Sequence, residues 1–272
     1  MIGRQLIALR AEWLKVRTTR MWWILLLVMV GYVGFTAAFI AFAFAALPQA
    51  AAGPVAPSLD DRTILLAIYT LGLPLGYVFP VVLGVLSITT EYRYQTLTPT
   101  FLGEPRRGLV LNAKLLVSFV IGLAAGVLAL GASVGAAAPV IALTGHAAKL
   151  DDPLIWRSLA QACLGMALWA GIGVGLGALL RNQVAAVVVI IVFSQLVEPL
   201  ARFGLNAWSA TRDIAEYLPG AAADAMAGAS LYNIGATASQ LLQWWQGGLV
   251  LAGYAALFCL LGGRITLRRD VT

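Results

Sequence analysis

The segment of residues 22–46 reads WWILLLVMVGYVGFTAAFIAFAFAA and contains no charged residue. About 20 consecutive apolar residues suffice to cross the hydrocarbon core of a bilayer as a helix. Five further segments are long and apolar enough to do the same. They cover residues 64–89, 115–143, 154–180, 184–200 and 244–263. We therefore predict an all-α membrane protein with six transmembrane helices, organised as a single domain over residues 1–272.

The overall composition supports this class of protein. Hydrophobic residues make up 61% of the 272 residues and charged residues only 11%, with a mean hydropathy of +0.88. Soluble domains contain about 45–50% apolar and about 25% charged residues, and disordered chains are poor in apolar residues. The composition therefore excludes a soluble enzyme and a disordered chain.

Positive charges are distributed unequally between the two sides of the predicted spans. The side that includes both chain termini carries 13 lysines and arginines, whereas the other side carries 5. Because cytoplasmic loops are rich in lysine and arginine, we expect both termini in the cytoplasm. The net charge of +6 therefore indicates orientation and contact with membrane lipids, and we expect no nucleic-acid partner.

Residues 1–21 precede the first span and are predicted to form an interfacial helix. Their apolar residues recur at intervals that place them on one helix face. They are Ile2, Leu6, Leu9, Trp13 and Val16. Arg4 and Lys15 lie on the opposite face, a pattern typical of a basic amphipathic helix at the membrane surface. The alternative is a positively charged flank that only sets the orientation.

The loop of residues 91–114 holds the densest group of polar side chains in the chain. A loop that only joined two spans could be much shorter, so this one is predicted to contact a partner. We expect two short helical pieces separated by Pro99 and Pro105, because proline tends to end the preceding helix. For the arginines of this loop, the alternative role is orientation and contact with lipid headgroups.

The stretch of residues 201–243 is too apolar for a solvated loop and too interrupted for a span. We expect short helices that dip into the outer leaflet, and a small extracellular cap is the alternative. Just before this stretch, Glu198 is the only acidic residue within the six predicted spans. Its side chain either reaches water at the outer end of the fifth span or acts in substrate passage or gating.

The sequence lacks the patterns that catalysis and nucleotide binding require. It contains no GxxxxGK[ST] phosphate loop, no HExxH motif, and a single histidine. We therefore expect no enzyme activity, no metal site and no cofactor on this chain. An ion-driven secondary transporter usually needs ionisable groups at mid-membrane, which these spans nearly lack. Energy for transport is therefore expected from a partner at the cytoplasmic loop.

Small residues recur four positions apart in the third and fourth spans. The pairs are Gly122/Gly126, Gly131/Gly135, Gly171/Gly175 and Gly173/Gly177. Such spacing lets helices approach closely in lipid, so these glycines are expected at helix contacts within one subunit. Because no polar ladder lines any span, the expected substrate is amphipathic or apolar.

Several short motifs, in the order in which they occur, resemble those of ABC-2-type permease subunits. They are Glu12 and Lys15 in the amphipathic start, Glu91-Tyr92-Arg93 followed by Thr96, Pro105-Arg106-Arg107 followed by Lys114, and Leu179-Leu180-Arg181-Asn182 between the fourth and fifth spans. The resemblance covers essentially the whole chain, including the six spans. It departs at one position, because many relatives carry glycine where this sequence has Gln95.

The resemblance implies an ABC exporter of the bacterial cytoplasmic membrane, in which the membrane and ATPase parts are separate polypeptides. Two permease subunits, identical or homologous, would pair with two cytoplasmic ATPase subunits that bind ATP and Mg²⁺. The N-terminal helix would connect to the bundle, and residues 91–114 would carry a coupling helix that docks on the ATPase. Residues 201–243 would form re-entrant helices near an external gate.

The functional residues that the resemblance implies fall in these three regions. ATPase coupling is expected from Glu91, Tyr92, Arg93, Thr96, Glu104, Arg106 and Arg107. The interfacial helix would contribute Leu6, Leu9, Glu12, Trp13 and Lys15, and the external gate Glu198, Tyr217 and Pro219. The alternatives are an ion-driven secondary transporter and a membrane scaffold or sensor that does not transport.

Overall fold

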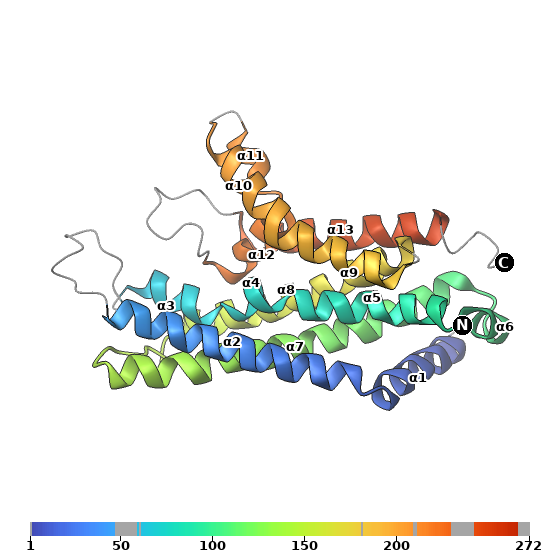
Figure 1. Cartoon of the computed structure of the whole chain (residues 1–272), viewed down its shortest axis with the longest axis horizontal. Helices are drawn as coiled ribbons and strands as arrows, with labels where there is room; N and C mark the ends of the chain where they lie inside the picture. Colours follow the sequence, from blue (N-terminus) through green and yellow to red (C-terminus); the bar gives the residue numbers. More distant parts are fainter. Residues whose placement is uncertain are drawn as a thin grey trace.

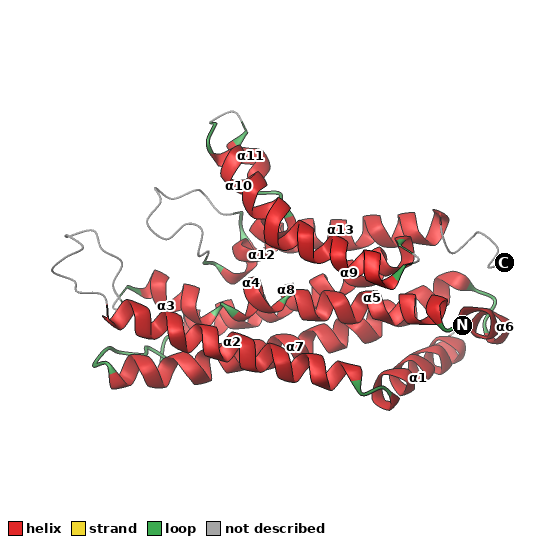
Figure 2. Cartoon of the chain, viewed as in Figure 1, coloured by secondary structure: helices red, strands yellow, loops and turns green. Residues whose placement is uncertain are grey.

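The computed structural model describes residues 2–46, 59, 61–180, 182–208, 211–229 and 242–265 of the chain. Within these residues the structure is helical and has no strand (Figure 2). Six helical segments of the described chain are long and apolar enough to cross a membrane. They are Met21–Ala46, Arg62–Arg93, Arg107–Leu143, Pro153–Leu179, Gln183–Leu205 and Trp244–Arg264. The predictions of an all-α fold and of six helices long and apolar enough to span a membrane are therefore confirmed. The predictions that concern Arg181, residues 209–210 and residues 230–241 lie outside the described residues.

The most buried span, α8 (Pro153–Leu179), forms the centre of the helical bundle (Figure 1). It packs against α5 (Val78–Arg93), α7 (Arg107–Leu143) and α13 (Trp244–Ile265). The first span, α2 (Met21–Ala46), packs against the other side of α7. The helix α7 begins eight residues before the predicted start at residue 115, so its first two turns occupy the last part of the predicted loop of residues 91–114.

Glycines allow α7 and α8 to approach their neighbours closely. A Cβ atom at Gly122 of α7 would lie 2.6 Å from the backbone of α8, and one at Gly177 of α8 would lie 2.7 Å from a carbonyl oxygen of α5. The glycine pairs on α8 and the first pair on α7 thus lie at helix contacts, as predicted. Gly131 and Gly135 differ, because no described atom beyond their own helix lies within 4 Å of a Cβ placed there.

The second span is divided into three helical pieces. They are α3 (Arg62–Tyr69), α4 (Gly72–Gly76) and α5. Each break lies just before a proline, Pro74 or Pro80, which lacks the N–H group that would continue the hydrogen-bond ladder. The two prolines therefore interrupt this span.

The fifth span is one continuous helical segment with a π turn in its second half. The helix α9 (Gln183–Val192) begins after Asn182, whose side-chain oxygen accepts hydrogen bonds from two N–H groups of the first turn. The segment continues through the π turn η1 (Phe193–Val197) into α10 (Glu198–Asn206). Pro199 cannot donate a hydrogen bond to the preceding turn, which accounts for the local widening of the helix.

Two short helices follow α10. They are α11 (Arg212–Ala215) and α12 (Pro219–Ala227). In Figure 1, α10 and α11 project away from the bundle, whereas α12 returns to it and packs against α4, α8 and α13. The short helices predicted within residues 201–243 are therefore present, and their position relative to a lipid leaflet stays a prediction.

The loop between the second and third spans contains one helix rather than the two expected pieces. This helix, α6 (Leu97–Gly103), includes Pro99 in its first turn. Proline does not interrupt a helix there, because the N–H groups of the first turn have no partner within the helix in any case. Pro105 does separate two elements, since α7 begins two residues later.

Candidate functional site

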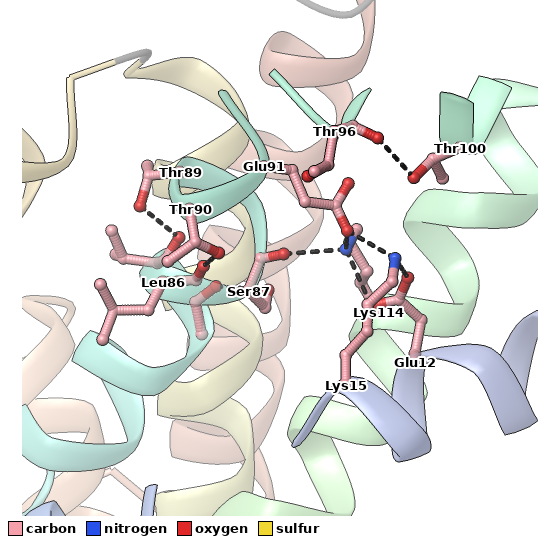
Figure 3. Close-up of polar contacts among 12 residues, drawn as sticks. Glu12, Lys15, Leu86, Ser87, Thr89, Thr90, Glu91, Thr96, Thr100 and Lys114 are labelled. Carbon is pink, nitrogen blue, oxygen red and sulfur yellow. Dashed lines mark hydrogen bonds and ion pairs between the residues drawn. The ribbon is translucent and has the colours of Figure 1, made fainter. Parts of the chain in front are cut away.

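Four charged side chains from three helices meet at the end of the bundle that holds α6 (Figure 3). They are Glu12 and Lys15 of the N-terminal helix α1 (Ile2–Thr18), Glu91 of α5 and Lys114 of α7, and we call them the ion cluster. The Nζ atom of Lys114 lies 2.8 Å from Glu12 Oε2 and 2.7 Å from Glu91 Oε1. The Nζ atom of Lys15 lies 2.6 Å from the Oε1 atom of each glutamate.

Burial makes the pairing within the ion cluster important for the fold. The side chain of Lys114 is only 3% exposed, and Glu12 and Glu91 are also buried. An ammonium group has three N–H donors, and the third one of Lys114 donates to the carbonyl oxygen of Ser87 at 2.8 Å. Two positive and two negative charges therefore balance in a region where an unpaired charge would be costly. The ion cluster joins α1 to α5 and α7.

Lys15 is the most exposed member of the ion cluster. Burial lowers the pKa of its ammonium group, but the hydrogen bonds and attraction from Glu12 and Glu91 outweigh burial, so its pKa lies above the ordinary value of 10.5. A raised lysine pKa contributes stability that is fully present below the unfolded pKa and is lost as the pH rises through the folded pKa. Lys15 therefore stabilises the ion cluster throughout the neutral range.

The apolar face of α1 is only partly covered by the bundle. Leu6 and Trp13 are exposed, and together with Leu9 they line a groove of about 350 Å³ that reaches Val117 of α7. The pattern of the sequence places Lys15 on the polar face, whereas the structure turns it towards α5. The cause is electrostatic, because two buried carboxylates lie on that side of α1.

The helix α6 and its flanks expose both cations and apolar side chains. Arg93 and Arg106 are exposed, and the guanidinium of Arg93 lies 5.7 Å from the centre of the Tyr94 ring. Tyr94 is 68% exposed and Leu102 is 81% exposed, although the sequence reasoning assigned neither a role. We call these four residues the α6 surface. Exposed apolar groups beside arginines are typical of a surface that binds another protein.

The other predicted coupling residues make contacts within the chain. They are Glu91, Tyr92, Thr96, Glu104 and Arg107. The guanidinium of Arg107 lies 5.2 Å from the centre of the Phe101 ring and so holds α6 against the start of α7. Glu104 accepts a hydrogen bond from the backbone N–H of Arg106 at 3.3 Å. The structure therefore brings only some of the predicted residues to the surface.

The turn between α5 and α6 is a Schellman motif around Gln95. The N–H of Thr96 donates to the carbonyl oxygen of Glu91 at 3.0 Å, and the N–H of Gln95 donates to that of Tyr92 at 3.3 Å. Gln95 has a φ of 56°, in the left-handed region that glycine adopts without steric cost. The equivalent turn at the end of α7 has Gly145 at this position, with a φ of 84°.

A second group of buried charges connects α10 and α12, and we call it the α10–α12 triad. Arg202 lies between two carboxylates, with Nη2 2.9 Å from Glu198 Oε1 and Nη1 2.7 Å from Asp224 Oδ2. Glu198 Oε1 also accepts a hydrogen bond from the backbone N–H of Gly220 at 2.5 Å. Glu198 is only 2% exposed, so its side chain points into the protein.

The predicted gate residues lie around the start of α12. Pro219 occupies the first position of this helix and is buried next to Gly220. Tyr217 is exposed, and its carbonyl oxygen accepts a hydrogen bond from the hydroxyl of Tyr254 at 3.2 Å. The structure therefore brings Glu198 into contact with α12, whereas Tyr217 connects this region to α13 through its backbone.

Two neighbouring cavities lie beside the α10–α12 triad. The polar cavity has a volume of about 270 Å³ and is lined by the triad together with Tyr77, Ser194 and Gln195, among others. The apolar cavity has a volume of about 240 Å³, and its lining includes Trp169, Phe193, Tyr254 and Phe258. Ser194 lines both cavities.

Sequence reasoning did not assign a site role to Lys114, Arg202 or Asp224. A signal was present for two of them, because Lys114 directly precedes a long apolar run and Asp224 is the only charged residue within the alanine-rich α12. A charge in such a setting needs a buried partner. The identity of that partner depends on how the helices pack.

No protein-family model matches the chain, and no curated protein is significantly similar to it. The function is therefore inferred from the geometry of the site and from the sequence motifs.

Proposed function

We propose that this chain is the membrane-spanning permease subunit of an ATP-driven exporter of the ABC-2 type, in the cytoplasmic membrane of a bacterium. Its substrate is an amphipathic or hydrophobic compound, such as a drug or a lipid, that leaves the cytoplasm or the inner leaflet. Two separate ATPase subunits bind ATP and Mg²⁺. A second permease subunit, identical or homologous, completes the complex.

The observation that carries this proposal is the ion cluster beside α6. Short turns connect α6 to α5 and α7, and the buried charges tie α1 to the same two helices. A displacement of α6 by a partner would therefore move three helices together. Closure of an ATPase dimer could in this way shift the bundle between two conformations, provided that the dimer binds them with different affinities.

The motifs that resemble ABC-2 permeases support this proposal by their positions. Glu12 and Lys15 are far from Glu91 and Lys114 in the sequence, yet the four residues form one cluster. Gln95 adopts the backbone conformation that favours glycine, so the departure from the family pattern changes a residue within the turn and leaves the turn itself in place.

The first test is whether an ATPase accompanies the chain. We expect an affinity-purified permease from its native host to retain a phosphate-loop ATPase in a fixed ratio, with ATP hydrolysis that substrate stimulates. A secondary transporter or a scaffold would be purified without one. Absence of any ATPase from complexes isolated in mild detergent would contradict the proposed function.

The second test concerns the α6 surface. The double variant Arg93→Glu/Arg106→Glu should reduce the ATPase retained per permease at least about fivefold, because it replaces two exposed cations at the proposed contact. Arg4→Glu/Arg10→Glu is the matched control, since it makes the same change of charge on exposed residues of α1. Equal loss in both variants, or unchanged retention in the first, would contradict docking at α6.

A further inference from the structure

We propose that the polar and apolar cavities together form a binding site for an amphipathic amine. The protonated amino group would lie in the polar cavity beside Glu198, and the apolar body would fill the neighbouring apolar cavity. This inference rests on the proposed function, because it narrows the substrate class of the exporter. The binding itself requires no ATPase.

The charges of the polar cavity favour a cation. Its lining contains two carboxylates, Glu198 and Asp224, against the single guanidinium of Arg202. Arg202 contacts one oxygen of each carboxylate. The second oxygen of Glu198, Oε2, is buried and has no hydrogen-bond donor among the described residues. An ammonium group would supply the missing donor to this oxygen.

The apolar cavity fits the body of such a ligand. Its lining combines aliphatic side chains with the aromatic rings of Trp169, Phe193, Tyr254 and Phe258. The indole N–H of Trp169 is buried, with no acceptor in the part of the chain that the structure describes. Trp169 itself is only 4% exposed. The cavity surface is apolar throughout, so it suits the hydrophobic body of the ligand.

The two cavities are adjacent, and we infer that one ligand occupies both. Ser194 on the π turn lines each of them, and Pro219 of the apolar cavity directly precedes Gly220 of the polar cavity. Tyr77 of the polar lining and Trp169 of the apolar lining form a stacked pair, with ring centres 4.2 Å apart. A molecule with a charged end and an aromatic end therefore matches the polarity of the site along its length.

Three ligands that share one carbon framework and differ in the charge of their end group test this inference. The permease alone is reconstituted in lipid nanodiscs, and binding of phenoxypropylamine, phenoxypropanol and phenoxypropanoate is measured by equilibrium dialysis, with empty nanodiscs subtracted. We expect the amine to bind at least about tenfold more tightly than the alcohol, and the carboxylate to bind most weakly. Equal affinities for the three compounds, or no binding of the amine, would overturn the inference.

Variants locate the site. Glu198→Gln should lower the affinity for the amine about tenfold and leave that for the alcohol unchanged, because it removes the charge and keeps the shape. Asp213→Asn is the matched control, since Asp213 is an exposed carboxylate outside both cavities. If Glu198→Gln binds the amine like the wild type, the site is not at Glu198. If this variant does not fold, the relative affinities of the wild type for the amine, the alcohol and the carboxylate still test the inference.

The outcomes separate this inference from the proposed function. Retention of an ATPase together with equal binding of the three compounds would contradict the amine site alone. Selective amine binding by a permease that never retains an ATPase would instead contradict the exporter.

Discussion

At the scale of single residues, Lys114 shows how one side chain can connect three helices. Its ammonium group donates to Glu12 on α1 and to Glu91 and Ser87 on α5, so each of its three N–H donors has an acceptor. A buried lysine with a complete set of partners is tolerated in a low-dielectric region, whereas an incomplete set would be costly. Lys114 therefore helps to hold α1 against α5 and α7.

Removal of Lys114 should loosen α1. Lys114→Met leaves two buried carboxylates with only Lys15 between them, and we expect a loss of about 3–5 kcal/mol in the free energy of unfolding. Hydrogen exchange of the α1 backbone should also become faster. Lys15→Met is the control, because its half-exposed side chain should contribute only about 0–1 kcal/mol. Equal melting temperatures for the two variants would contradict the central role of Lys114.

At the scale of helices, glycines determine how closely the spans approach. On α8, Gly173 and Gly177 face α5, while Gly175 faces α13, so opposite sides of the same helix are both in close contact. Without a hydrophobic driving force between helices in lipid, such close packing is a main source of stability. This explains why α8 occupies the centre of the bundle.

A single added methyl group should therefore distinguish glycines that pack against another helix from glycines that do not. Gly177→Ala places a Cβ atom 2.7 Å from a carbonyl oxygen of α5, and we expect a loss of about 1–3 kcal/mol in stability through overpacking. Gly131→Ala meets no described atom within 4 Å and should leave the stability unchanged or slightly higher. Thermal unfolding of both variants in the same detergent provides the comparison, and a larger effect at Gly131 would contradict this packing.

At the scale of the whole molecule, the two groups of buried charges lie in different parts of the bundle. The ion cluster lies beside α6, at the end that includes α1 (Figure 1). The α10–α12 triad lies where α12 returns to α4 and α8. In the proposed exporter, the first would receive the movement of the ATPase and the second would border the substrate site.

The orientation of the molecule can be tested by cysteine labelling. In a chain in which Cys163 and Cys259 are replaced by alanine, we introduce Ala147→Cys in the turn between α7 and α8, or Arg106→Cys beside α6. A membrane-impermeant maleimide should label the first in intact cells, because that turn is expected outside, and the second only after the membrane is opened. Labelling in the reverse order would contradict cytoplasmic termini.

The sequence by itself determined the all-α membrane fold and the six spans. Hydrophobicity over about 20 residues is a local property, and lipid requires each span to satisfy its backbone hydrogen bonds internally. The breaks of the second span and most of the contact glycines were equally visible, because proline and glycine act on their own helix and its closest neighbours. Two details of the local structure differ from the prediction. Pro99 is tolerated in the first turn of α6, and α7 begins eight residues before its predicted start.

Only the tertiary structure decided which charges meet. Glu12 and Lys114 are 102 residues apart, and Arg202 and Asp224 are 22 apart and on different helices. The sequence showed that these residues were charged and that several stood in apolar surroundings. It could not show their partners, because the energy of a buried charge depends on the groups that packing brings within a few ångströms of it.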